Sequence, residues 1–332
     1  MNYISGFTNT LREAHHRIKP YIHTTPILTS EILNSMLKAE IYFKAESLQK
    51  TGAFKVRGVL NHLLSLQQDH KLPTKVVAYS TGNHGIGLAY AAKILKIHAR
   101  IYLPKDTARI KQQAAEYYEA EVIYTNTRQE AENLSKLDVN NGFYHMHPSD
   151  NDLVIAGAGT TCLEALEQLN FKPDAIFASC GGGGLLSGTY LAKEALSPSS
   201  LLIGCEPEQA NDAYQSMRQG KIYRFHHSPD TVADGLRTLG LSERTFNYIK
   251  KLDKFFLVSE HNILYWTAWL AHLLNIACEP SCALNMNGVQ QWLSTQKLPK
   301  KILVIISGGN IDPCLYQKLQ KEDYLLRTPY RR

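Results

Sequence analysis

The sequence lacks the long apolar run that a membrane span requires, and it lacks paired cysteine motifs. No uninterrupted apolar stretch approaches the roughly 20 residues of a membrane-spanning helix. The first 20 residues, MNYISGFTNTLREAHHRIKP, contain no apolar segment of the signal-peptide type. No CxxC spacing occurs among the six cysteines, which are Cys162, Cys180, Cys205, Cys278, Cys282 and Cys314. We therefore expect reduced thiols in a cytoplasmic protein with no membrane association.

A strong excess of charge of one sign is also missing. The net charge of +6 over 332 residues is mild, and the basic residues are scattered apart from the final RTPYRR. This distribution does not favour nucleic-acid binding. A mild positive charge is equally compatible with a small acidic ligand. With 44% hydrophobic and 20% charged residues, the chain has the composition of a globular protein with a substantial core.

From residue 75 onward, short β-rich apolar runs alternate with longer helix-like segments. The runs expected as strands are 75–80, 99–104, 121–125, 142–147, 175–179, 201–206, 255–259 and 301–307. The segments expected as helices are 85–96, 109–120, 185–196, 263–276 and 288–294. Such alternation predicts an α/β fold in which parallel sheets are covered by helices.

A run of four glycines, Gly181 to Gly184, follows one expected strand in AIFASCGGGGLLSG. Glycine loses more backbone entropy on folding than any other residue, so a run of glycines in a domain needs a reason. We favour a loop whose main-chain N–H groups bind an anion at the start of the next helix, with a flexible turn as the alternative. The loops STGNHG and SGGN also follow expected strands, and the three loops together favour a cofactor site.

Two known nucleotide-binding loops are alternatives for the glycine run. A phosphate loop of the P-loop type is excluded because Thr189 stands where that motif needs lysine. A dinucleotide loop is weakened because Leu186 replaces its third glycine, but Glu206 lies about 20 residues further on, where an acid binds ribose. A nicotinamide-dependent oxidoreductase therefore stays open as an alternative.

A lysine in SLQKTGAFKVRGVLNHL helps to choose between these cofactors. Lys55 stands between Phe54 and Val56, so its amine is a candidate for burial in a pocket. Burial lowers the pKa of a lysine and makes its amine a nucleophile toward an aldehyde. A reactive lysine together with an anion-binding glycine loop favours pyridoxal phosphate over a nucleotide.

These motifs together resemble the fold-type II pyridoxal-phosphate enzymes, in particular the serine racemase and serine/threonine dehydratase group. The similar stretches occur in family order and are TGAFKVRG, STGNHG, VIAGAGT, CGGGG, CEPEQANDAYQS, TVADGLRT, CEPSCAL and SGGN. The resemblance covers nearly the whole chain and implies a two-domain α/β fold of the tryptophan synthase β type. It implies a large cofactor-binding domain of residues 1–75 and 149–332 and a small inserted domain of residues 76–148.

The resemblance also implies the site residues. Lys55 would carry pyridoxal 5'-phosphate and act as the base at Cα, and the neutral hydroxyl of Ser307 would face the pyridine nitrogen. The implied cofactor contacts are Phe54, Lys55, Asn83, Gly181, Gly182, Gly183, Gly184, Leu185 and Ser307. The implied contacts of the substrate carboxylate are Ser80, Thr81, Asn83 and His84.

The activity implied is that of an ammonia-lyase that dehydrates L-threonine or L-serine to a 2-oxo acid and ammonia. Racemases of this group have a stretch similar to SSGNH here, and the hydroxyl of its second serine delivers a proton. Thr81 occupies the position of that serine, whereas many pure dehydratases have alanine there. Serine racemisation, or action on hydroxyaspartate or a diamino acid, is therefore an alternative. A further alternative is a protein that keeps the cofactor but has only a binding role.

A divalent-cation site and a homodimer are the last features that the resemblance implies. Glu206, the main-chain carbonyl of Ala210 and Asp212 would bind magnesium, or calcium or manganese, because hard cations prefer oxygen ligands. Without the resemblance, two acids at this place would be interpreted as a helix cap. His145 and His147 are expected to pack rather than to bind a metal.

Overall fold

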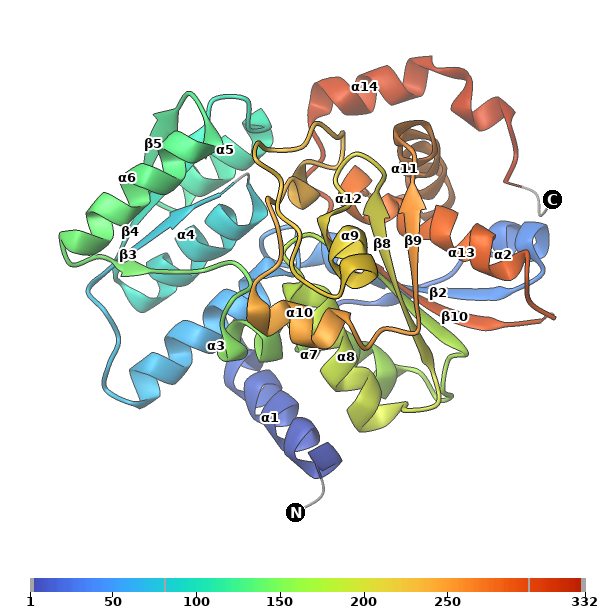
Figure 1. Ribbon diagram of the computed structural model, residues 1–332, viewed down its shortest axis with the longest axis horizontal. Helices are drawn as coiled ribbons and strands as arrows, with labels where there is room; N and C mark the ends of the chain where they lie inside the picture. The colour runs from blue at the N-terminus through green and yellow to red at the C-terminus, as the bar shows by residue number, and fades with distance from the viewer. Residues whose placement is uncertain (1–2, 81, 298, 330–332) are drawn as a thin grey trace.

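The computed structural model describes residues 3–80, 82–297 and 299–329. It contains a six-stranded and a four-stranded sheet, each covered by helices (Figure 1). The α/β architecture with parallel sheets predicted from the sequence is therefore confirmed. None of the described helices combines the length and apolarity that crossing a membrane requires.

The six-stranded sheet has its shortest strand, β1, at one edge. Its strands are β1 (Ile27–Leu28), β2 (Glu40–Ala45), β7 (Ala175–Ser179), β8 (Leu201–Pro207), β9 (Lys254–Val258) and β10 (Lys301–Ile306). They lie in the order β1-β2-β10-β7-β8-β9, and all neighbours are parallel except β1 and β2. The sequence patterns predict β7 to β10, whereas β1 and β2 lie before the first expected strand.

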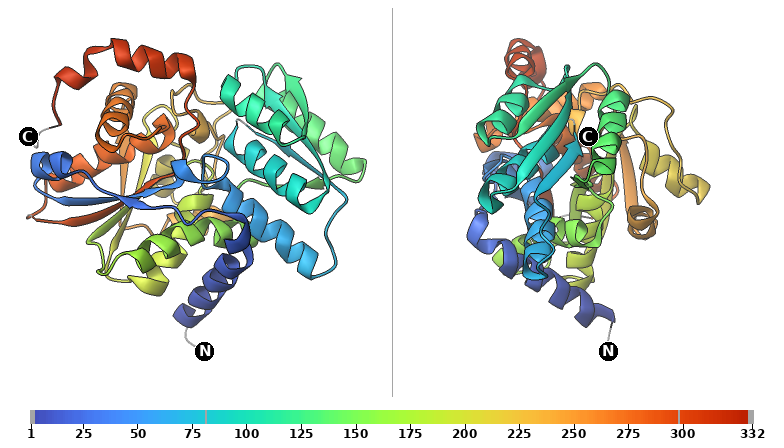
Figure 2. Two further views of the ribbon diagram at one scale, coloured as in Figure 1. Left: turned by 180° about the vertical axis from the view of Figure 1, so that it is seen from behind. Right: turned by 90° about the vertical axis from the view of Figure 1, so that its left-hand side faces the viewer.

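The four-stranded sheet is parallel throughout. Its strands are β3 (Lys75–Tyr79), β4 (His98–Pro104), β5 (Glu121–Thr125) and β6 (Tyr144–His145), in the order β5-β4-β3-β6. Figures 1 and 2 show this sheet and its helices, in cyan and green, to one side of the six-stranded sheet. The sheet falls almost wholly within the segment 76–148, although the domain boundaries themselves stay a prediction.

Helices fill the connections between strands. They are α1 (Tyr3–Ile18), α2 (Glu31–Leu37), α3 (Lys55–Gln68), α4 (Asn83–Leu95), α5 (Arg109–Tyr117), α6 (Arg128–Asn140), α7 (Asp152–Gln168), α8 (Gly184–Leu196), α9 (Asp212–Gln219), α10 (Glu243–Ile249), α11 (Glu260–Leu274), α12 (Pro280–Ala283), α13 (Asn285–Leu293) and α14 (Pro313–Lys321). Short 3-10 helices are η1 (Lys19–Tyr21), η2 (Glu46–Leu48), η3 (Asp234–Leu236) and η4 (Asp323–Leu326).

The two faces of the six-stranded sheet belong to different parts of the core. In β10, Ile302, Val304 and Ile306 pack on one face, and Leu303 and Ile305 pack on the other. The first face shares a core with α11 and α13, and the second shares a core with α7 and α8. Burial on both faces explains why the sequence of β10 is apolar throughout.

Candidate active site

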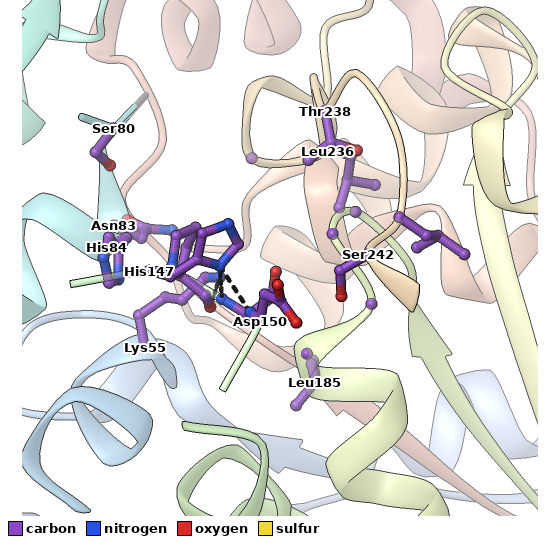
Figure 3. A pocket seen from close by; sticks show the side chains of 18 of the residues that line it. Lys55, Ser80, Asn83, His84, His147, Asp150, Leu185, Leu236, Thr238 and Ser242 are labelled. Carbon is purple, nitrogen blue, oxygen red and sulfur yellow. Dashed lines mark hydrogen bonds between the residues drawn. The ribbon is translucent and has the colours of Figure 1, made fainter. Parts of the chain in front are cut away.

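A cavity of about 310 Å³ lies where loops from both sheets meet. Its lining contains the ends of β3 and β7 and the loop after β10, so it follows the rule that ligands bind at the carboxyl ends of parallel strands. The predicted residues found in the lining are Phe54, Lys55, Ser80, Asn83, His84, Gly181, Gly182, Gly183, Gly184, Leu185 and Ser307. Thr81 lies outside the described residues. Figure 3 shows Lys55, Asn83 and His84 on one side of the cavity and Leu236, Thr238 and Ser242 on the other.

Lys55 is the first residue of α3, and its side chain points into the cavity (Figure 3). Its Nζ donates a hydrogen bond to the carbonyl oxygen of Pro148 at 3.2 Å and lies 5.2 Å from the centre of the Phe54 ring. Burial lowers the pKa of Lys55 to about 8, and the positive charge of Arg128 adds to this effect. A substantial fraction of the amine is therefore neutral near physiological pH and able to attack an aldehyde.

Close approach of other residues constrains Gly182, Gly183 and Gly184, and backbone conformation also constrains Gly183. Gly183 has a φ of +81° and immediately precedes α8. A Cβ on Gly182 would lie 2.7 Å from Oγ of Ser149, and a Cβ on Gly184 would lie 3.0 Å from Cβ of Ser149. The loop leads into α8, whose first N–H groups have no acceptor within a helix and favour an anion. The arrangement thus fits a phosphate group.

The loop at the start of α4 is held by side chains. Oγ of Ser80 accepts hydrogen bonds from the main-chain N–H groups of Gly82 at 3.0 Å and Gly85 at 3.1 Å. Nε2 of His84 lies 2.7 Å from the carbonyl oxygen of Met146. Burial lowers the pKa of His84 to about 3, so this imidazole is neutral and donates to that carbonyl.

Asn83 is fixed by partners that the sequence did not reveal. Its Nδ2 donates to Oε1 of Glu279 at 2.8 Å, and its Oδ1 accepts from Nδ2 of Asn310 at 2.9 Å. The buried carboxylate of Glu279 also pairs with Nζ of Lys111 at 3.0 Å, and Lys111 reaches Asp234 at 2.7 Å. The motifs CEPSCAL and TVADGLRT contain Glu279 and Asp234, but nothing in their spacing shows these contacts.

Ser307 closes the cavity at the end of β10. Its hydroxyl-bearing side chain is buried and lines the cavity, and its carbonyl oxygen accepts a hydrogen bond from the N–H of Phe54 at 3.0 Å. This bond ties the SGGN loop to the segment that carries Lys55. A neutral hydroxyl and a reactive amine therefore belong to one lining.

His147 belongs to the same lining, whereas the sequence predicts only that it packs rather than binds a metal. Its Nδ1 accepts hydrogen bonds from the main-chain N–H groups of Ser149 at 3.2 Å and Asp150 at 2.7 Å. Burial lowers the pKa of His147 to about 4. The neutral ring therefore carries its proton on Nε2. Alternation along β6 does not predict this, because His147 lies beyond the end of that strand.

The predicted cation ligands lie outside the cavity lining. Glu206, Ala210 and Asp212 are all buried, and the carboxylate of Glu206 accepts from the N–H groups of Ala213 and Tyr214 at 3.1 Å each. Glu206 therefore caps α9 and cannot serve a ribose in the cavity, which removes the reason for a nicotinamide site.

The same pair of acids nevertheless has hydrogen-bonding capacity that the described residues do not use. Oδ1 of Asp212 accepts from the hydroxyl of Thr238 at 3.3 Å, while its buried Oδ2 has no partner among the described residues. Burial raises the pKa of Asp212 to about 7 and that of Glu206 well above its usual range, where the negative charge of Asp212 adds to the effect. An orphaned oxygen beside a second carboxylate fits a cation.

Comparison with known proteins agrees with this chemistry. The sequence is 40% identical over 317 residues to the L-threo-3-hydroxyaspartate ammonia-lyase of Saccharomyces cerevisiae, covering 94% of this chain and 96% of that protein. It is 40% identical over 307 residues to the serine racemase of Dictyostelium discoideum, covering 91% and 94%. The crystal structure of the T.th. threonine deaminase, 40% identical, superposes with a TM-score of 0.85 over 92% of this chain and 98% of that one. Residues 18–308 match the family described as pyridoxal-phosphate dependent enzyme, and the chain therefore belongs to that family.

Proposed function

We propose that the protein is an ammonia-lyase that dehydrates a β-hydroxy amino acid of the L-threonine and L-serine class to a 2-oxo acid and ammonia. The observation that carries this proposal is the lining of one cavity by Lys55, the glycine loop and Ser307. Relatives named as a hydroxyaspartate ammonia-lyase and a serine racemase, and a solved structure named as a threonine deaminase, support an amino acid as substrate.

We assign to the residues of the cavity the roles that the resemblance implies. Pyridoxal phosphate, when bound, supplies a sink for the electrons left at Cα after proton loss. The N–H groups of Gly181 to Gly184 would hold its phosphate, and the neutral hydroxyl of Ser307 would face its ring nitrogen and favour the unprotonated form. Lys55 would hold the cofactor and take the proton from Cα, and its lowered pKa suits it to be a base.

The substrate carboxylate is assigned to the loop that contains Ser80, Thr81, Asn83 and His84. Support comes from the lining position of Ser80, Asn83 and His84 and from the bonds that fix their side chains. The neutral state of His84 means that this loop would bind the carboxylate through hydrogen bonds rather than through an ion pair.

We also infer that Glu206, Asp212 and the carbonyl of Ala210 hold a divalent cation such as magnesium. Two buried carboxylates with an orphaned Oδ2 support this inference, and all three ligands are hard oxygen atoms. The three ligands lie beside α9 and outside the cavity lining, so the cation would stabilise the fold rather than contact the substrate.

Turnover by the purified, cofactor-loaded protein tests the proposed reaction. We expect equal amounts of 2-oxo acid and ammonia from L-serine or L-threonine. Lys55→Ala should lower kcat by at least about 1,000-fold because it removes the base and the cofactor link. Lys50→Ala is the matched control, since Lys50 is an exposed lysine five residues earlier.

Two results would contradict this function. Racemisation that exceeds 2-oxo acid formation would make the protein a racemase. Bound cofactor without turnover of any β-hydroxy or diamino acid would instead indicate a binding role.

A further inference from the structure

Two cysteines of the motif CEPSCAL lie in contact in the core. The Sγ atoms of Cys278 and Cys282 are 3.5 Å apart, and both side chains are buried. The chain turns between them, because the carbonyl oxygen of Glu279 accepts hydrogen bonds from the N–H groups of Cys282 at 3.0 Å and Ala283 at 3.1 Å. No other two cysteine sulfurs in the described part of the chain form such a contact. The pair is therefore a dithiol whose two sulfurs are close enough to bond after a small movement.

The thiol of Cys282 also contacts the loop that follows β10. Its Sγ donates to the carbonyl oxygen of Gly308 at 3.4 Å and to that of Glu279 at 3.2 Å. Gly308 directly follows Ser307, and Ser281 directly precedes Cys282. Both of these serines line the cavity. The dithiol therefore lies next to the cavity wall, which a small solute in the cavity can reach.

The residue after Cys278 is the acid that fixes Asn83. The carboxylate of Glu279 accepts from Nδ2 of Asn83 at 2.8 Å and from the N–H of Asn310 at 2.9 Å, and it pairs with Lys111 at 3.0 Å. A disulfide has an S–S distance of about 2.0 Å, so its formation has to move parts of the segment 278–282. In a close-packed core such a movement shifts the neighbouring groups. A bond between the two cysteines would therefore disturb the contacts of Glu279.

The two thiols differ in their readiness to react. Burial by itself raises the pKa of a thiol, but the hydrogen bond from Cys278 holds the pKa of Cys282 below its usual value. The same hydrogen bond, together with burial, raises the pKa of Cys278. Because the thiolate is the form that attacks a peroxide, Cys282 is the thiol that reacts first and Cys278 the one that resolves.

We propose that Cys278 and Cys282 form a redox switch, in which hydrogen peroxide converts the dithiol into a disulfide that weakens cofactor binding and turnover. The effect on turnover rests on the proposed lyase function, whereas the formation of the bond does not. The sulfur of Cys282 attacks one peroxide oxygen, the O–O bond breaks, and one water leaves behind a sulfenic acid. The sulfur of Cys278 then displaces the hydroxyl of that acid, which leaves as a second water with the proton of Cys278. The two thiols lose two electrons, and one hydrogen peroxide becomes two waters.

Peptide mapping of the holoenzyme tests the bond itself. Trypsin releases residues 255–297 as one peptide, whose only cysteines are Cys278 and Cys282. After treatment with peroxide and then iodoacetamide, we expect this peptide to carry no alkyl group and to lack two hydrogen atoms. Dithiothreitol before alkylation should restore the doubly alkylated peptide. A peptide that keeps both alkyl groups after peroxide, or that is oxidised to a sulfinic acid without the bond, would overturn the proposal.

Cofactor binding and turnover measure the consequence of the bond. The oxidised protein should bind pyridoxal phosphate about tenfold more weakly and turn over L-serine at least about tenfold more slowly than the reduced protein. This is the loss expected when one hydrogen bond to a charged group is broken. Dithiothreitol should reverse both changes.

Variants assign the reversible loss to the two sulfurs. Cys278→Ala and Cys282→Ala, each compared with itself before peroxide, should show no loss that dithiothreitol reverses. The matched control is Cys314→Ser, which removes an exposed thiol and should respond to peroxide as the wild type does. A reversible loss that persists in Cys278→Ala would overturn the proposal.

Failure of the switch and failure of the lyase function give different results. If the peptide were bridged but the Kd of pyridoxal phosphate and the turnover were those of the reduced protein, the bond would not act on the site and the switch would be refuted. If the bridged protein bound the cofactor more weakly but even the reduced protein turned over no amino acid, the switch would be supported and the lyase function refuted.

Discussion

The reactivity of Lys55 follows from its burial, and this predicts how cofactor loading depends on pH. With a pKa of about 8, the amine is mostly protonated below that pH and mostly neutral above it. Only the neutral amine attacks the aldehyde, so the initial loading rate should rise about tenfold per pH unit below 8 and level off above it. Stopped-flow absorbance of the apoenzyme mixed with pyridoxal phosphate measures this rate. A rise that continues to pH 10, as for an exposed lysine, would contradict it.

Thr81 should affect the ratio of racemisation to dehydration. Its hydroxyl could deliver a proton to the face opposite Lys55, and its extra methyl restricts the rotamers available for that step. In Thr81→Ala, the ratio of racemisation to dehydration of L-serine should fall at least about tenfold, the low end of the contribution of a positioned acid. Chiral chromatography beside a 2-oxo acid assay gives the ratio. Thr81→Ser is the matched control, and an unaltered ratio in Thr81→Ala would exclude the second proton donor.

At single residues, the sequence predicts the motif positions better than their partners. Lys55 and Arg57 look alike in GAFKVRG, yet Lys55 faces the cavity and Arg57 is fully buried against Glu46 at 2.7 Å and Glu164 at 3.0 Å. The two side chains differ by half a helical turn, and the acids that take up Arg57 come from distant segments. Such long-range pairing leaves no local pattern, which is also why Glu279 is not predictable.

At the scale of one element, the turn from β7 into α8 depends on glycine at Gly183. An alanine there would be held in a left-handed backbone conformation, which costs about 1–2 kcal/mol. Its Cβ would also lie 2.8 Å from Cβ of Thr245. We expect Gly183→Ala to lower the free energy of unfolding by more than Gly220→Ala and to weaken pyridoxal phosphate binding. Gly220 is the matched control because its φ is +67° but no atom lies within 4 Å of an added Cβ.

Urea denaturation and cofactor titration of both variants measure these effects. Gly220→Ala should share the backbone cost but keep the cofactor affinity of the wild type, because it ends α9 away from the cavity lining. If both variants bound pyridoxal phosphate as the wild type does, the glycine loop would not be the phosphate site.

The strands were predictable where short β-rich runs alternate with helix-like segments. All eight expected strands overlap a strand of the structure, from β3 to β10. The antiparallel pair β1 and β2 escapes prediction because it lies before the alternating part of the sequence and because EIYFKA in β2 mixes charged and apolar side chains. Lys44 in that strand is buried because distant segments supply its partners, among them Glu164 of α7 at 2.5 Å and the carbonyl oxygen of Thr25 at 2.6 Å.

At the scale of the whole molecule, the two sheets and the cavity between their loops follow from the order of the motifs, whereas the contacts across the cavity do not. Lys111 of α5 reaches Glu279 and Asp234 from the side of the four-stranded sheet, and no periodicity in 109–120 distinguishes it. The homodimer and the cytoplasmic location stay predictions.

The proposed cation site predicts a change in the stability of the whole chain. Two buried carboxylates, Glu206 and Asp212, repel each other in the folded state, and a cation bound between them would remove this repulsion. Because the unfolded chain lacks the site, magnesium at about a hundredfold excess over its Kd should stabilise the fold by about 2.7 kcal/mol. Calorimetric Tm values with magnesium and with a chelator measure this, and Asp212→Asn should abolish the difference. If the Tm of the wild type were the same in both conditions, these acids would only cap α9.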